Sequence, residues 1–193
     1  MKAMETRRIT YLGLFTAAAL VLHVVESALP PLLVFAPGAK MGLGNVVSLV
    51  AVFILGVADA YFILTVRCLL GAVFGGGIWS LAYSLPAGLI SLTVEVLLIK
   101  LLLPRISLIS VSFTGALLHN AVQLFVASVT VGVNLLPVLP LFMLASVIAG
   151  LFVGFTAYFT INYLPPKTYF LPVGICGAAA ADKKKPSDGD KQN

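Results

Sequence analysis

ESALPPLLVFAPGAKMGLGN (residues 26–45) separates two long apolar runs and decides how this chain is organised. Its three prolines remove backbone donors and fix φ, so a regular helix cannot continue through it. Its glycines allow tight bends and a close approach of the backbone to a bound molecule. Glu26, Lys40 and Asn45 are its polar groups at the edges of the apolar runs. We interpret residues 26–45 as a lid or binding loop, with a plain connector as the alternative.

The composition indicates a multi-pass membrane protein, which we expect in a bacterial plasma membrane. Of the 193 residues, 60 % are hydrophobic and 10 % are charged, and the mean hydropathy is +1.08. Soluble domains carry about 25 % charged residues. The net charge of +5 does not indicate a nucleic-acid partner, because most Lys and Arg residues lie near the chain ends and in one loop. Basic residues in such places set the orientation of membrane helices.

The apolar segments predict an all-α integral membrane protein with six transmembrane helices. One helix over residues 43–74 would be about 48 Å long, against a hydrocarbon core of about 30 Å. We therefore expect two shorter spans there, with a turn around residues 56–59. The predicted spans are residues 9–25, 43–58, 60–74, 78–103, 108–133 and 141–164. Residues 1–167 form the predicted transmembrane domain, and residues 168–193 a C-terminal segment that ends in a disordered polar tail.

Ionisable side chains inside a membrane cost free energy and usually mark function. Arg67 lies near the middle of the third predicted helix, so it needs an anionic ligand or a carboxylate partner. Glu95 and Asp59 are the carboxylates that would give a purely structural ion pair. The predicted substrate-binding residues are Glu26, Lys40, Asn45, Arg67, His119, Asn120 and Gln123.

The fifth predicted helix carries polar or small residues at three- and four-residue spacing. With His119 beside them, they are Asn120, Gln123, Ala127, Thr130 and Asn134. Residues at this spacing share one helix face. We interpret the face as one wall of a pocket, and hydrogen bonding between helices as the alternative.

Small residues also recur on the first helix. Gly13 and Ala17 stand four residues apart and Ala18 follows, which gives a smooth face for another helix. Packing inside the chain and docking to a partner both fit this pattern.

Known enzyme motifs are absent from the sequence. It contains no Walker A, HExxH, GxSxG or CxxC motif. Cys68 and Cys176 lie far apart, so they indicate neither a disulfide framework nor a metal site. No two acidic residues lie close together in the membrane body, which excludes a prenyl-synthase type of Mg²⁺–diphosphate site. We therefore expect no catalysis, no metal and no cofactor in this chain.

Three motifs together resemble the Gx transporter family, which is labelled heptaprenyl diphosphate synthase component I. They are PGAKMGLGN (residues 37–45), Arg67 and HNxxQ (residues 119–123). That family is similar to the S components of energy-coupling factor (ECF) transporters. The resemblance implies six helices and a vitamin-like ligand near the outer face. It also implies docking through the first helix, here Gly13, Ala17 and Ala18, to an ECF transmembrane subunit that works with two cytoplasmic ATPases.

Two functions follow as hypotheses. The first is the substrate-binding S component of an ECF-type importer for a small, anionic vitamin- or isoprenoid-like molecule. The second is a non-catalytic membrane accessory subunit of a prenyl-diphosphate or quinone pathway. Apart from membrane lipid, the expected partners are the ligand and the ECF subunits in the first case, and a soluble prenyl synthase in the second.

The basic residues predict that both termini are cytoplasmic. A reporter enzyme fused after Lys167 should therefore give the signal of a cytoplasmic location. A fusion of the same reporter within residues 134–140 is the control and should score on the opposite side of the membrane. A periplasmic or extracellular signal after Lys167 would contradict this topology.

Overall fold

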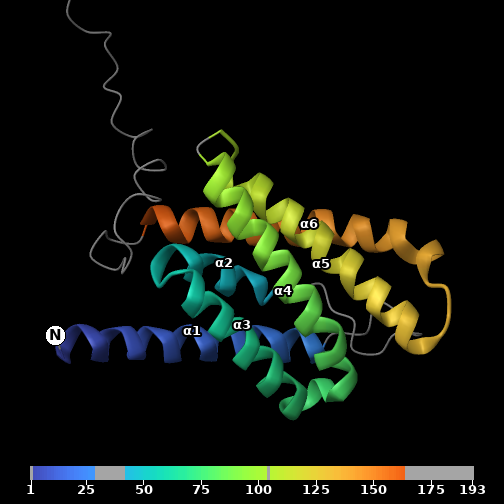
Figure 1. Ribbon diagram of the computed structural model, residues 1–193, viewed down its shortest axis with the longest axis horizontal. Coiled ribbons are helices and arrows are strands. Elements are labelled where there is room, and N and C mark those ends of the chain that lie inside the picture. The colour runs from blue at the N-terminus through green and yellow to red at the C-terminus, as the bar shows by residue number, and fades with distance from the viewer. Residues whose placement is uncertain (1, 29–41, 104, 164–193) are drawn as a thin grey trace, which may run out of the picture.

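The computed structural model describes residues 2–28, 42–103 and 105–163, and within these ranges it contains helices and no strand (Figure 1). The α-helices are α1 (Lys2–Ala28), α2 (Asn45–Ile54), α3 (Val57–Gly71), α4 (Gly77–Leu102), α5 (Leu108–Val131) and α6 (Leu139–Tyr163). Two short elements join them, the π-helix η1 (Ala72–Gly76) and the 3-10 helix η2 (Leu136–Val138). The prediction of an all-α protein is confirmed for the described residues.

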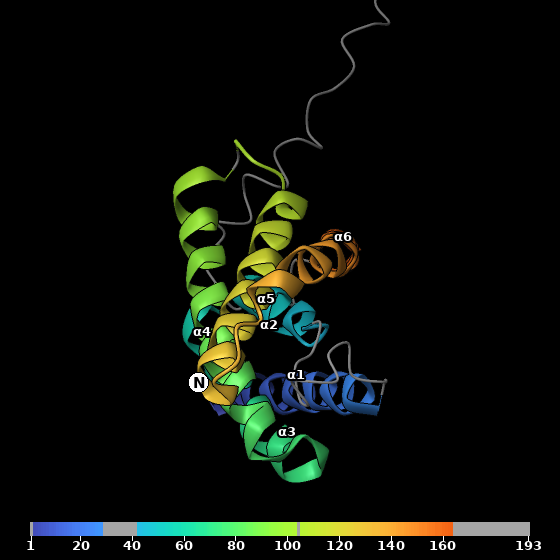
Figure 2. The same ribbon diagram turned by 90° about the vertical axis from the view of Figure 1, so that its right-hand side faces the viewer.

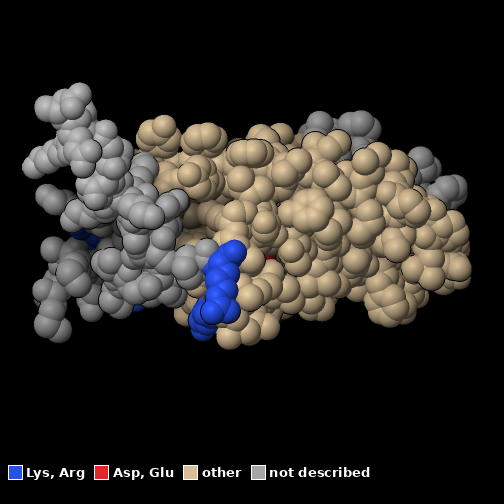
Figure 3. Space-filling model, turned by 90° about the horizontal axis from the view of Figure 1, so that it is seen from above, with Lys and Arg blue, Asp and Glu red and all other residues tan. Residues whose placement is uncertain are grey.

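Five helices are long and apolar enough to cross a membrane. The candidate spans are Thr6–Glu26, Val57–Phe74, Gly77–Leu102, Leu108–Val131 and Leu136–Tyr163. Large apolar side chains are exposed along these helices, and uncharged residues cover most of the face in Figure 3. Such a surface suits contact with lipid tails. The protein is therefore a membrane protein with several apolar helices.

The predicted span at residues 43–58 is much shorter than expected. Helix α2 has 10 residues, which gives it a length of about 15 Å, half of a hydrocarbon core. The predicted division of residues 43–74 into two helices is confirmed, and the turn lies at Gly56, whose φ is 117°. Only glycine adopts this backbone conformation at low cost. The number of six crossings and the cytoplasmic placement of both ends stay predictions.

Helix α2 occupies the interior of the bundle. It lies between α1 and α6 (Figures 1 and 2), and every one of its residues is buried. A helix that is apolar all round is stable only when it is enclosed. Its apolar side chains join those of α3 and α4 in the main hydrophobic core. Helix α2 ends beside the start of α3, and its N-terminal end stops near the middle of the bundle (Figure 1).

Helices α5 and α6 pack closely because α6 carries glycine at the contact. A Cβ atom added at Gly150 would lie 2.9 Å from Cα of Phe113, and one added at Gly154 would lie 3.0 Å from Cα of Ile109. Two hydrogen bonds cross the same interface. Ser112 Oγ donates to the Gly150 carbonyl (3.2 Å), and Asn120 Nδ2 donates to Ser146 Oγ (2.7 Å). Small residues and polar side chains of this kind hold membrane helices together.

Gly150→Ala should lower the melting temperature of the purified protein, because the new methyl group meets backbone that cannot rotate away. Forcing such a group into a packed interface costs about 1–3 kcal/mol. Gly13→Ala is the matched control, since nothing lies within 4 Å of a Cβ atom there. Alanine is favoured over glycine in a helix by about 1 kcal/mol, so this variant should melt at the same or a higher temperature. Equal shifts in both variants would contradict the close packing of α5 and α6.

Candidate functional site

A small polar pocket lies where α1, α3, α4 and α5 meet the N-terminal end of α2. Its cavity volume is about 10 Å³, which is about the space that one water molecule needs. Its lining residues are His23, Glu26, Gly42, Arg67, Ser84 and His119. A polar pocket inside an apolar bundle is unusual, because each buried polar group loses its contact with water.

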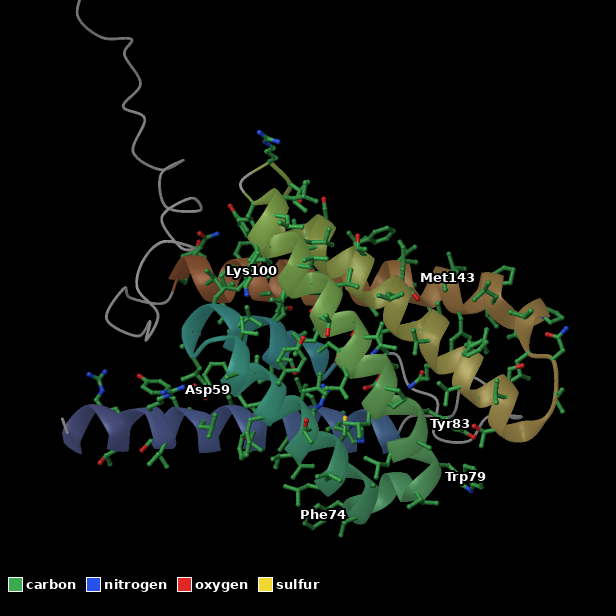
Figure 4. The ribbon with its side chains drawn as sticks, in the orientation of Figure 1. Asp59, Phe74, Trp79, Tyr83, Lys100 and Met143 are labelled. Carbon is green, nitrogen blue, oxygen red and sulfur yellow. The ribbon has the colours of Figure 1, made fainter. Side chains whose placement is uncertain are left out.

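The pocket lies away from the N-terminal end of the bundle. Helices α2 and α3 form a hairpin around Gly56, so Asn45 and Arg67 stand at about the same height on its two arms. Asp59 and Lys100 mark the end near the N-terminus, and Trp79 and Tyr83 mark the opposite end (Figure 4). The lining residues therefore lie between these two ends, at the depth where α2 begins.

Arg67 is the cation of the pocket and is almost completely buried, with 2 % of its surface exposed. Its Nη2 donates to Asn45 Oδ1 over 3.0 Å. The guanidinium occupies the space that a side chain at Gly44 would need, so glycine is required there. Within residues 2–28, 42–103 and 105–163, Nε of Arg67 has no hydrogen-bond partner. Asn45 thus orients the guanidinium from behind the pocket and does not itself line it.

Neither of the two carboxylates considered as structural partners of Arg67 forms a direct ion pair with it among the described residues, although the charge of Glu95 interacts with that of Arg67 through space. Asp59 pairs with Arg8 over 2.7 Å and so ties α3 to α1. Glu95 is buried against the backbone of Gly115 on α5. Within the described ranges, Arg67 takes part in no ion pair. The interpretation of Arg67 as half of a structural salt bridge is therefore not supported.

Glu26 and His23 reach the pocket from one face of α1, because they are three residues apart. Glu26 Oε1 accepts a hydrogen bond from the backbone N–H of Gly42 over 2.6 Å. The imidazole of His23 lies directly on Gly71 of α3, where a Cβ atom would overlap it. These contacts join the last turns of α1 to α3 and to the segment that enters α2.

The predicted polar face of α5 divides between two surroundings. His119 lines the pocket and contacts Gly42, where an added Cβ atom would lie 3.0 Å from His119 Cδ2. Asn120 instead bonds Ser146 on α6, since successive helical residues point about 100° apart. Gln123 is completely buried and does not line the pocket. Hydrogen bonding between helices, which was the alternative interpretation, holds for Asn120.

The structure therefore brings Glu26, Arg67 and His119 together, with Asn45 supporting Arg67. Lys40 lies outside the described residues. His23 and Ser84 also line the pocket, although neither is among the predicted substrate-binding residues. The three-residue spacing of His23 from Glu26 could have indicated the histidine, whereas Ser84 gave no comparable signal.

The small residues of α1 lie on its outer surface. Gly13, Ala17 and Ala18 are exposed, whereas Ala19 is fully buried toward the core. Packing inside the chain therefore does not account for this face, and it remains open to lipid or to a partner.

The pocket can hold charge and form hydrogen bonds. It presents one guanidinium, one carboxylate, two imidazoles and one hydroxyl group. Among the described residues, no three or more His, Cys, Asp or Glu side chains are placed to hold a metal ion. The arrangement suits recognition of a small polar molecule.

Comparison with known proteins identifies the family. The model of the family described as heptaprenyl diphosphate synthase component I matches residues 15–160, which include all the lining residues of the pocket. No similar curated protein was found, and neither was a similar solved structure. The matched range exceeds half of the 193 residues. The chain belongs to the heptaprenyl diphosphate synthase component I family.

Proposed function

We propose that this protein is a non-catalytic membrane subunit that binds a small molecule with an anionic group in the pocket. The buried Arg67 is the observation that carries the proposal. Its charge is removed from water, and among the described residues its Nε has no hydrogen-bond partner and no carboxylate lies within ion-pair distance of it. A buried charge without a partner costs several kcal/mol. A bound anion would supply the missing partner.

The short helix α2 supports the same proposal. Its N-terminal end, at Asn45, lies beside the guanidinium of Arg67. The N-terminus of a helix carries a partial positive charge and favours anions nearby. Membrane transporters place interrupted helices so that their N-terminal ends face anionic groups of the substrate. The half-length of α2 therefore fits a binding function. Lys40, by its position in the sequence, is a further candidate contact.

Two assemblies are proposed as the setting of this binding. In the first, the protein is the S component of an ECF-type importer, and the exposed small face of α1 docks to the ECF transmembrane subunit. In the second, it is the accessory membrane subunit of a prenyl-diphosphate pathway, which the family description favours because it names a component of heptaprenyl diphosphate synthase. A pocket that binds an anionic group is compatible with both assemblies.

Ala17→Trp should reduce the amount of partner that co-purifies with the protein, because the indole separates the helix backbones at the docking face. Ile148→Trp on α6 is the control, since Ile148 is also exposed and lies on another helix. If ATPase subunits co-purify with the wild type and with Ile148→Trp but not with Ala17→Trp, the importer is supported. If a soluble prenyl synthase co-purifies in place of the ATPase subunits, the accessory subunit is supported. Equal recovery of partners in both variants would contradict docking through α1.

Arg67→Gln should abolish the binding of inorganic phosphate and pyrophosphate, measured by calorimetry on the protein in detergent. Loss of a charge-assisted hydrogen bond weakens binding about ten- to a hundredfold. The melting temperature of the empty protein should stay the same or rise, because an unpaired buried charge is removed.

Asn120→Ala is the control for this experiment. It should lower stability, because hydrogen bonds between membrane helices contribute about 0.6–1.7 kcal/mol, and it should leave phosphate binding unchanged. A destabilised Arg67→Gln variant with full phosphate affinity would overturn the proposed anion site.

A further inference from the structure

We propose that Glu95 is a proton-binding site coupled to Arg67, so that an anion bound by Arg67 is taken up together with one proton. This inference rests on the proposed function and adds a second site, which lies outside the pocket. Its starting point is a carboxyl group buried within the candidate membrane span α4. This group does not line the pocket and forms no ion pair among the described residues.

The surroundings of Glu95 compensate its charge poorly. Only 3 % of its surface is exposed, and a Cβ atom at Gly115 on α5 would overlap its Oε1. No hydrogen bond or ion pair between described residues involves Glu95. A buried carboxylate is stable only if a positive charge nearby compensates the loss of water, and otherwise it binds a proton and becomes neutral.

Arg67 supplies the nearby positive charge. It lies on α3, which packs against α4, and it is buried like Glu95. The two charges act on each other through space and not through a direct ion pair. In a region of low dielectric, such an interaction remains strong beyond contact distance. The charge state of Glu95 therefore depends on whether the charge of Arg67 is already neutralised.

The other titratable groups near Glu95 come from few elements. Of the elements packed against α4, α2 and η1 carry no titratable residue. Helix α5 carries His119, one turn beyond Gly115 on the same face, and the charge of Arg67 acts on this histidine too. His119 is therefore the alternative proton-binding group that an experiment has to separate from Glu95. The remaining titratable residues on α3 and α4 are Asp59, Tyr61, Cys68, Tyr83 and Lys100.

An anion bound to Arg67 changes the charge balance at Glu95. It neutralises the guanidinium, so the carboxylate loses an attraction and meets a second negative charge instead. The neutral carboxyl form is then favoured, and an oxygen of Glu95 binds a proton from solution. Coupling between two binding sites is reciprocal. A proton on Glu95 therefore strengthens anion binding, because it removes a competing negative charge.

Removal of the Arg67 charge tests the coupling without a ligand. Infrared spectra of the full-length protein in detergent, each compared with the same protein carrying Glu95→Gln, identify the C=O band of protonated Glu95. Arg67→Gln imitates neutralisation by an anion, so the band should persist to a pH about 1–3 units higher than in the wild type. Arg67→Lys keeps the charge and should stay closer to the wild type. Asp59→Asn is the control and should leave the band unchanged, because Asp59 pairs with Arg8.

Calorimetric titration with chloride and with sulfate tests the coupling in the wild type, whether or not Arg67→Gln folds. Neither anion titrates near neutral pH, so a proton that is taken up must be bound by the protein. Titrations in two buffers of different ionisation enthalpy should show uptake of up to one proton for each anion bound. Where Glu95 is ionised in the empty protein, the affinity should rise about tenfold for each unit by which the pH falls. Glu95→Gln should bind the anion more tightly at the same pH and take up no proton.

The possible outcomes separate the inference from the proposed function. Anion binding that depends on Arg67 but takes up no proton would overturn the proton site and keep the anion site. Proton uptake that survives Glu95→Gln would belong to His119 or to the pocket residues His23 and Glu26, which also overturns it. An unchanged Glu95 band in Arg67→Gln would do the same. If neither anion binds, or if binding does not depend on Arg67, the proposed function fails and the coupled uptake fails with it.

Discussion

The hydrogen bond from Arg67 to Asn45 is the contact around which the centre of the bundle is arranged. It joins Arg67, a buried cation of the pocket, to the first residue of α2, and it places both at the depth where that helix begins. A guanidinium at this depth costs several kcal/mol unless its donors are used. The glycine before Asn45 leaves the space that this side chain occupies.

The same constraint explains why the residues around the pocket are small where they touch it. Gly44 leaves room for Arg67, Gly71 leaves room for His23, and Gly42 lies against His119. Each glycine lies opposite a long polar side chain from another helix. This protein therefore fits polar groups into an apolar bundle by placing glycine on the facing backbone, which keeps the helices close together and the interior dense.

Much of the fold could be predicted from the sequence, because long apolar runs, prolines and basic loops have direct physical meaning in a membrane. The division of residues 43–74 followed from the length of the run alone, and Gly56 provides the turn. The short length of α2 was not predicted, because the apolar pattern continues through the turn at Gly56, where the structure ends the helix. The contact of Asn45 with Arg67 could not be predicted either, because the two residues are distant in the sequence.

The candidate site could also be predicted in part. Ionisable residues at membrane depth indicated Glu26, Arg67 and His119. The direction of the Asn120 side chain depends on how α5 is rotated against α6, and the spacing of residues in the sequence does not determine that rotation.

The burial of α2 has a consequence for the order in which this protein is assembled. A helix of ten residues cannot reach water at both ends of a bilayer, so α2 is not stable in lipid as an independent span. Its cover includes α6, which is synthesised more than 80 residues later. Insertion therefore begins with α1 and the later long helices, and α2 reaches its final environment only after the C-terminal helix has left the ribosome. Gly42, which precedes α2 and lines the polar pocket, therefore reaches its final place late in assembly.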